Sequence, residues 1–241
     1  MSKGKRDRST KARQIVEHQR AAERRRTVTI WTSVAVVVVL FIAGLVGWNM
    51  MADQDDGKVT TPTAAVDDGT AFAVGSGPVT VDIYEDFMCP ACNSFEQASS
   101  ATLKQLVDAG KVTVRYHPVA ILDRFSNGTE YSTRSAAASA AAAQEGKFTE
   151  YHEVLFANQP AEGSDGLSDE KLIELGKSVG LTSDTFADAV NNGSYRSWAA
   201  QATEKFSERN FTGTPTITVN GEQLETPSPE QLTQAVEKAA G

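Results

Sequence analysis

The only two cysteines of this 241-residue chain lie three positions apart, in Cys89-Pro90-Ala91-Cys92. Two thiols at this spacing can close a small disulfide and reopen it, so thiol–disulfide exchange is the first chemistry to consider. Val79 to Tyr84 alternate and are rich in β-branched residues, which predicts a strand that ends just before the motif. A helix should begin at Pro90, because proline is tolerated at the first helical position.

This placement makes Cys89 the expected nucleophile. The first turn of a helix has unpaired N–H groups and the positive end of the helix dipole, and both stabilise a thiolate over a thiol. Cys92 lies inside the first turn and is the expected resolving cysteine, which attacks a mixed disulfide formed at Cys89.

Three other uses of the two cysteines compete with redox chemistry. A structural disulfide is disfavoured, because a four-residue ring constrains the unfolded chain far less than a bridge between distant segments. A zinc site would need a second pair of ligands, and the chain offers only His18, His117 and His152 as histidines. Two inert core cysteines are the third and weakest possibility. A redox-active pair is therefore preferred.

The N-terminal part of the chain predicts a membrane anchor. Residues 1–27 form a basic tail with ten Lys/Arg and three Asp/Glu, although the whole chain has a net charge of −8. Residues 28–50 contain no charged side chain, and at about 1.5 Å per residue they can cross a hydrocarbon core of about 30 Å. Trp31 and Trp48 lie near the two ends, where interfacial aromatic residues belong.

A cleaved signal peptide is the alternative for 28–50, but its apolar part would be shorter and would end in an A-x-A-like site. The basic tail could instead bind nucleic acid, yet beside an apolar span it more often sets topology. We therefore expect an uncleaved signal anchor in the cell membrane and no nucleic acid partner. The N-terminus should be cytoplasmic and the remainder extracytoplasmic.

Residues 51–77 are rich in Asp, Thr, Gly, Pro and Ala, which predicts a flexible linker. A folded domain is expected over 78–241. No disulfide staples it, but about 160 residues are enough for a core of its own. After the motif we expect a helix to Ala109 and a strand over Lys111–His117, which together with the first strand make a parallel, right-handed βαβ unit.

A helical insertion should follow, over about 118–210, since the 97 residues between His117 and Pro215 far exceed what a crossover needs. Helices are predicted over 131–144, 148–157, 168–179, 183–190 and 195–208. The bulky core of this lid should comprise Tyr131, Phe148, Tyr151, Leu155, Leu172, Phe186, Trp198 and Phe206. A strand over 216–219, a hairpin turn at Asn220-Gly221 and a helix after Ser228 complete the chain.

This order of elements, with Gly213-Thr214-Pro215 before the last hairpin, resembles the DsbA family of thioredoxin-fold thiol–disulfide oxidoreductases, in the membrane-anchored form of actinobacteria. The resemblance covers about 78–241. It implies an α/β thioredoxin-like fold with a helical insertion, here preceded by one transmembrane helix. It also implies that Pro215 is cis and lies beside the cysteines, where it shapes the substrate groove with Thr214, Pro90 and Ala91.

Two positions depart from that family. It carries a buried acid six residues before the first cysteine, where this chain has Ile83; Asp82 and Glu85 flank it, but strand alternation sends Asp82 to the opposite face. DsbA also has His at the position of Ala91. Without that charge partner, the Cys89 thiolate should depend mainly on the helix terminus.

The resemblance implies an extracytoplasmic oxidase that introduces disulfides into exported proteins and is reset by a membrane redox partner. No cofactor and no metal are expected. The direction of exchange depends on redox poise, so a reductase or isomerase of the same fold is an alternative. A metal-binding or chaperone module that uses Cys89 and Cys92 as ligands is another.

Overall fold

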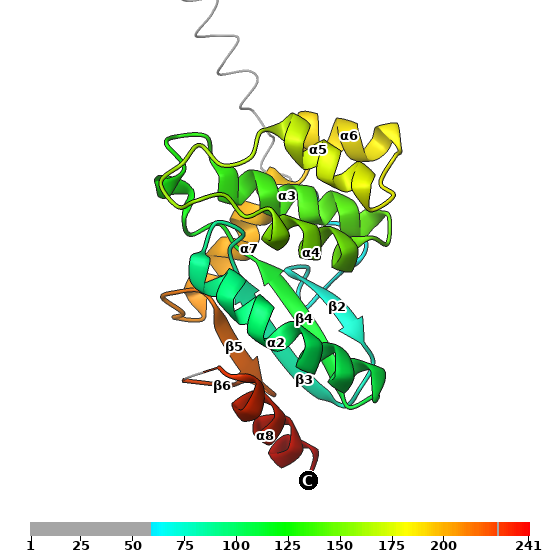
Figure 1. The fold of residues 1–241 in the computed structure, drawn as a ribbon, viewed down its shortest axis with the longest axis vertical. Helices are drawn as coiled ribbons and strands as arrows, with labels where there is room; N and C mark the ends of the chain where they lie inside the picture. Colours follow the sequence, from blue (N-terminus) through cyan, green and yellow to red (C-terminus); the bar gives the residue numbers. More distant parts are fainter. Residues whose placement is uncertain (1–58, 226) are drawn as a thin grey trace, which may run out of the picture. The chain divides into compact units, whose positions relative to one another are not determined.

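The computed structural model describes residues 59–225 and 227–241. In this part of the chain a six-stranded sheet in the order β1-β2-β4-β3-β5-β6 is combined with a group of helices (Figure 1). The predicted tail and membrane span, residues 1–27 and 28–50, lie outside the described residues. Among the helices that are described, none has both the length and the apolar character of a membrane span.

The centre of the sheet is the predicted βαβ unit. Strand β3 (Val79–Glu85) runs parallel to β4 (Val112–Pro118), and helix α2 (Pro90–Asp108) connects them. Side chains alternate along β3, so Val81 and Ile83 point into an apolar core under α2, whereas Asp82 points to the other face. The parallel pairing predicted from the sequence is confirmed.

The C-terminal elements add to the sheet and to the core that lies under α2. Strand β5 (Thr216–Val219) pairs antiparallel with β3, and a turn at Asn220-Gly221 with positive φ at both residues leads into β6 (Glu222–Gln223). Helix α8 (Pro229–Ala240) starts at Ser228, whose hydroxyl accepts the Gln231 N–H. Helices α2 and α8 contact each other and share one core against the sheet (Figure 1).

The prediction of a flexible linker over 51–77 is wrong for the second half of that range, because two strands form there. Strands β1 (Ala65–Val66) and β2 (Ala71–Gly75) make a hairpin, and β2 pairs antiparallel with β4. Phe72 is 2% exposed and packs on Trp198, with the centroids of the two rings 5.0 Å apart. The partners of β2 lie far along the chain, so the small residues of this segment gave no local sign of a strand.

The insertion forms the predicted helices, which gather at one end of the sheet (Figure 1). They are α3 (Tyr131–Gln144), α4 (Phe148–Ala157), α5 (Asp169–Ser178), α6 (Asp184–Asn191) and α7 (Arg196–Glu208). A short 3-10 helix that was not predicted, η1 (Asp123–Phe125), precedes them. The alanine-rich α3 is central and contacts α4, α5, α6 and α7, because its short side chains let neighbouring helices approach. The eight bulky residues predicted as core are all buried.

Candidate dithiol site

The two cysteines lie at the corner where β3 turns into α2. Cys89 is the N-cap residue of α2, with φ −77° and ψ 116°, and Pro90 occupies the first turn, as predicted. Both cysteines are free thiols. The Cys89 side chain is 6% exposed and Cys92 2% exposed, while Pro90 and Ala91 between them are exposed. A molecule approaching the pair therefore meets Pro90 and Ala91 first.

The surroundings of Cys89 favour its thiolate. A hydrogen bond from the Cys92 thiol is the largest cause that lowers the pKa of Cys89, whereas burial raises it. The Thr214 side chain and the N–H groups of Cys92 and Ala91 lower it further, so that the net pKa of Cys89 is about 6. The helix terminus thus contributes as expected, but the neighbouring thiol contributes more. In the protonated state the Cys89 thiol donates to the Thr214 carbonyl oxygen at 3.2 Å.

Cys92 is the opposite case. Burial and the adjacent Cys89 raise its pKa well above the ordinary value. The Asp86 N–H donates to the Cys92 Sγ at 3.5 Å. The site therefore pairs one sulfur that ionises easily with one that keeps its proton, which is the division of roles that stepwise exchange requires.

Thr214 and Pro215 come to the site from the far end of the insertion. The Thr214–Pro215 peptide bond is cis, as the resemblance implies, and it immediately precedes β5. The Thr214 hydroxyl is buried and, among the described residues, has no hydrogen-bond partner. The structure thus brings Thr214 against Cys89, with Pro215 next to it.

The position of the family's buried acid is apolar here: Ile83 is 1% exposed and belongs to the core under α2. Asp82 lies on the opposite face, as strand alternation predicts, and Glu85 pairs with His152, whose Nε2 is 2.8 Å from the Glu85 Oε1. Neither flanking acid replaces the missing one by facing the cysteines.

The sequence interpretation missed Asp86, which is 0% exposed and lies between β3 and the motif. Its Oδ1 accepts the Met88 N–H at 2.9 Å and the Ser132 hydroxyl at 2.7 Å, and its Oδ2 accepts the Leu122 N–H at 3.0 Å. Burial is the largest cause that raises the pKa of Asp86, these three hydrogen bonds lower it, and the charge of Cys89 raises it, so that the net pKa is about 7. An Asp two residues before the N–H that it binds is an Asx-turn signal, which could have drawn attention to it.

Gln159 was also missed. Its Nε2 donates to the Cys89 carbonyl at 2.9 Å and to the Phe87 carbonyl at 3.1 Å. This amide fastens the segment after α4 to the start of α2. No local pattern marks such a residue, because its partners are some 70 positions away.

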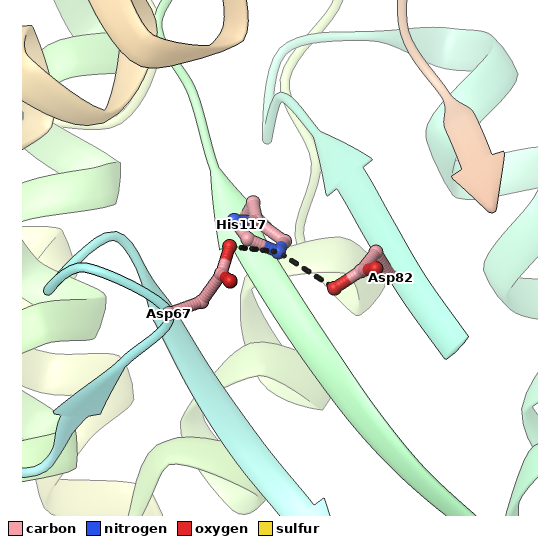
Figure 2. Close-up of side chains that lie close together, drawn as sticks. All are labelled: Asp67, Asp82 and His117. Carbon is pink, nitrogen blue, oxygen red and sulfur yellow. Dashed lines mark hydrogen bonds and ion pairs between the residues drawn. The ribbon is translucent and has the colours of Figure 1, made fainter. Parts of the chain in front are cut away.

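A separate cluster of possible metal ligands, Asp67, Asp82 and His117, lies on the other face of the sheet (Figure 2). The His117 Nε2 is 3.1 Å from the Asp82 Oδ1 and 3.9 Å from the Asp67 Oδ2. Arg115 already binds Asp82 through two nitrogens, at 2.6 and 2.9 Å, and Asp67 at 2.9 Å. Arg209 binds Asp67 as well, at 2.7 Å. The cluster is therefore an ion-pair network that joins the β1–β2 turn to β3, β4 and Arg209, the residue that follows α7.

Comparisons with known proteins agree with this geometry. The family described as Thioredoxin matches residues 67–238. The reduced form of the disulfide bond oxidoreductase DsbG from Mycobacterium tuberculosis is 34% identical, with 72% of this chain and 88% of that chain covered and a TM-score of 0.64. Reduced DsbA from the same organism is 33% identical, with 71% and 93% covered and a TM-score of 0.63.

A curated relative, the serine/threonine-protein kinase PknE of M. tuberculosis, is 28% identical over 161 residues, which are 63% of this chain and 28% of the kinase. The chain thus spans less than a third of that relative's length. The family match and the two oxidoreductase structures, together with the paired thiols beside a cis proline, lead to one conclusion: the chain belongs to the thioredoxin family and is a thiol–disulfide oxidoreductase of the DsbA type.

Proposed function

We propose that this enzyme is an oxidase that introduces disulfides into exported proteins. The observation that supports the direction is the contrast between its two thiols, with the pKa of Cys89 lowered to about 6 and that of Cys92 raised. A stabilised thiolate lowers the free energy of the reduced enzyme, so its disulfide tends to be passed to a substrate.

In the proposed cycle the oxidised enzyme carries a Cys89–Cys92 disulfide. A substrate thiolate attacks the Cys89 Sγ, and Cys92 leaves and takes up a proton. A second substrate thiolate then attacks the substrate sulfur of the mixed disulfide, and Cys89 leaves as a thiolate. Two electrons pass from the substrate to the enzyme, and a membrane redox partner that accepts them restores the disulfide.

Pro215 and Thr214 on one side, and Pro90 and Ala91 on the other, are the proposed substrate contacts. Pro90 and Ala91 are exposed, and Thr214 lies against the reacting sulfur. An extended substrate segment could lie between them and present its cysteine to Cys89.

The extracytoplasmic location is part of the proposal and rests on the sequence. The basic residues 1–27 precede an uncharged stretch, 28–50, which favours a single span with a cytoplasmic N-terminus. Stable disulfides also form mainly outside the cytoplasm. Protease added to intact spheroplasts should digest the C-terminal domain and spare the tail, whereas a mature chain beginning near Ala52 would contradict the anchor.

The direction of exchange is tested by trapping thiols in growing cells with acid, followed by alkylation. We expect Cys89 and Cys92 to be mostly a disulfide, with Cys92→Ala as the control for the labelling pattern. A mostly reduced pair would indicate a reductase or isomerase. Thiol titration with and without stoichiometric copper or zinc tests the metal-binding alternative, which predicts protection of both thiols by the metal.

A further inference from the structure

Asp86 is a buried carboxyl group. It is 0% exposed, and among the described residues its oxygens accept hydrogen bonds only from neutral donors, namely the N–H groups of Met88 and Leu122 and the hydroxyl of Ser132. In the part of the chain that the structure describes, no Lys, Arg or His forms an ion pair with it. An ionised carboxylate in such a place is costly and sensitive to any further charge nearby.

The backbone of Asp86 holds it against both cysteines. Its carbonyl oxygen accepts the Cys89 N–H at 2.9 Å, and its N–H donates to the Cys92 Sγ at 3.5 Å. Among the described residues, Tyr131 on α3 is a further titratable group that interacts with Asp86, and burial raises the pKa of that phenol so that it stays neutral. The charge that changes beside Asp86 during exchange is therefore that of Cys89.

We propose that Asp86 sets the redox poise of the cysteine pair: its carboxylate opposes the Cys89 thiolate, and it takes up a proton when the enzyme is reduced. This inference rests on the exchange chemistry of the proposed function and deepens it. The enzyme disulfide and two substrate thiols give a substrate disulfide, the Cys89 thiolate, the Cys92 thiol and one proton. The Asp86 carboxylate accepts that proton, so charge balances within the site. Asp86 is thus a positioning residue that acts through Cys89.

The coupling between Asp86 and Cys89 should affect the enzyme near neutral pH. The pKa of Asp86, which is raised mainly by burial, is about 7, and the pKa of Cys89 is about 6, so the two groups titrate as a pair. Above this range the carboxylate is ionised and disfavours the reduced enzyme. Below it the carboxyl is neutral and no longer opposes the thiolate.

The test is Asp86→Asn in the full-length protein, with Asp123→Asn as the matched control. Asp123 also accepts two hydrogen bonds from α3, through Thr133 at 3.0 and 2.6 Å, but is bonded to neither cysteine. Asp86→Asn should shift the thiolate absorbance titration of Cys89 to lower pH. At about pH 8, where the wild-type carboxylate is ionised, it should also make the protein roughly threefold to tenfold more oxidising in its equilibrium with glutathione. The difference from wild type should shrink toward about pH 5.5, where Asp86 is protonated in both states.

Ser132→Ala is a second variant that tests the inference independently. It leaves the charge in place but removes a donor that stabilises the carboxylate, so the pH at which wild type and Asp86→Asn diverge should move upward. If Asp86→Asn does not fold, the pH profile of Ser132→Ala against wild type carries the test.

The inference is overturned if Asp86→Asn has the wild-type profile, or if its difference from wild type is the same at every pH, which would indicate packing alone. A failure of the oxidase proposal would look different. The wild-type pair would then be found reduced in cells, while the effect of Asp86 on the thiolate titration would persist.

Discussion

The Cys89 thiol lies 3.2 Å from the main-chain oxygen of Thr214, a residue 125 positions later in the chain. A carbonyl oxygen accepts a bond from a thiol but repels a thiolate, so this contact belongs to the protonated state. When Cys89 ionises, the Thr214 hydroxyl, which is buried without a partner among the described residues, is the nearby group of Thr214 that can donate. Thr214 thus offers a different atom to each protonation state.

Thr214→Val should therefore raise the pKa of Cys89 from about 6 toward the free-cysteine value of about 8.5, because it removes the hydroxyl that favours the thiolate. Thiolate absorbance against pH measures the change. Thr233→Val is the matched control, since the Thr233 hydroxyl bonds to the Pro229 carbonyl within α8. Equal curves for Thr214→Val and wild type would show that the hydroxyl plays no part.

The two cysteines should differ in what their loss does. Cys89→Ala should abolish oxidation of a reduced model substrate, because the sulfur that forms the mixed disulfide is gone. Cys92→Ala should leave that attack intact and trap mixed disulfides, visible as larger species on non-reducing gels. Trapping by Cys89→Ala instead would reverse the assignment of the two roles.

Ala91→His should make the protein more oxidising. Ala91 is exposed, so the larger side chain fits without disturbing the core, and an imidazolium beside the thiolate should lower the pKa of Cys89 below about 6. Ala98→His, at another exposed position of α2, is the control. The effect should be larger at about pH 6 than at about pH 8, where the imidazole is neutral; an effect independent of pH would contradict this cause.

The reduced protein should gain stability from Cys89 as pH rises. A pKa of about 6 in the folded state, below about 8.5 when unfolded, adds stability that is fully present above about pH 8.5 and is lost as pH falls to about 6. Urea unfolding under reducing conditions should show a difference between wild type and Cys89→Ser that reaches at most about 3 kcal/mol and vanishes below about pH 6. A constant difference would point to packing.

Arg115→Met should destabilise the fold by about 3–5 kcal/mol, because it leaves the buried Asp82 without its bidentate partner. Restoring neutrality with Asp82→Asn in the same chain should recover part of that loss. Lys104→Met, which breaks an exposed pair with Asp108, should cost less than about 1 kcal/mol. Since His117 and Arg115 hold the pKa of Asp82 well below its usual range despite burial, the network's contribution should be lost only at strongly acidic pH. An Arg115→Met protein as stable as wild type would contradict this role.

The features that the sequence by itself determined are local. Pro90 at the start of α2, the Asn220-Gly221 turn and the Ser228 cap each depend on interactions between residues a few positions apart, and each appears where it was predicted. The alternation along β3 likewise separated Asp82 from Ile83 correctly. The membrane span over 28–50 stays a prediction.

Only the tertiary structure decided the features that depend on distant partners. Strand β2 exists because β4 and Trp198 cover it, and Gln159 matters because folding brings it to Cys89. Asp86 looks like an ordinary turn residue until Leu122 and Ser132 enclose it. Burial is a property of the assembled chain, and it is burial that turns an exposed acid into one whose charge is sensitive to a neighbouring thiolate.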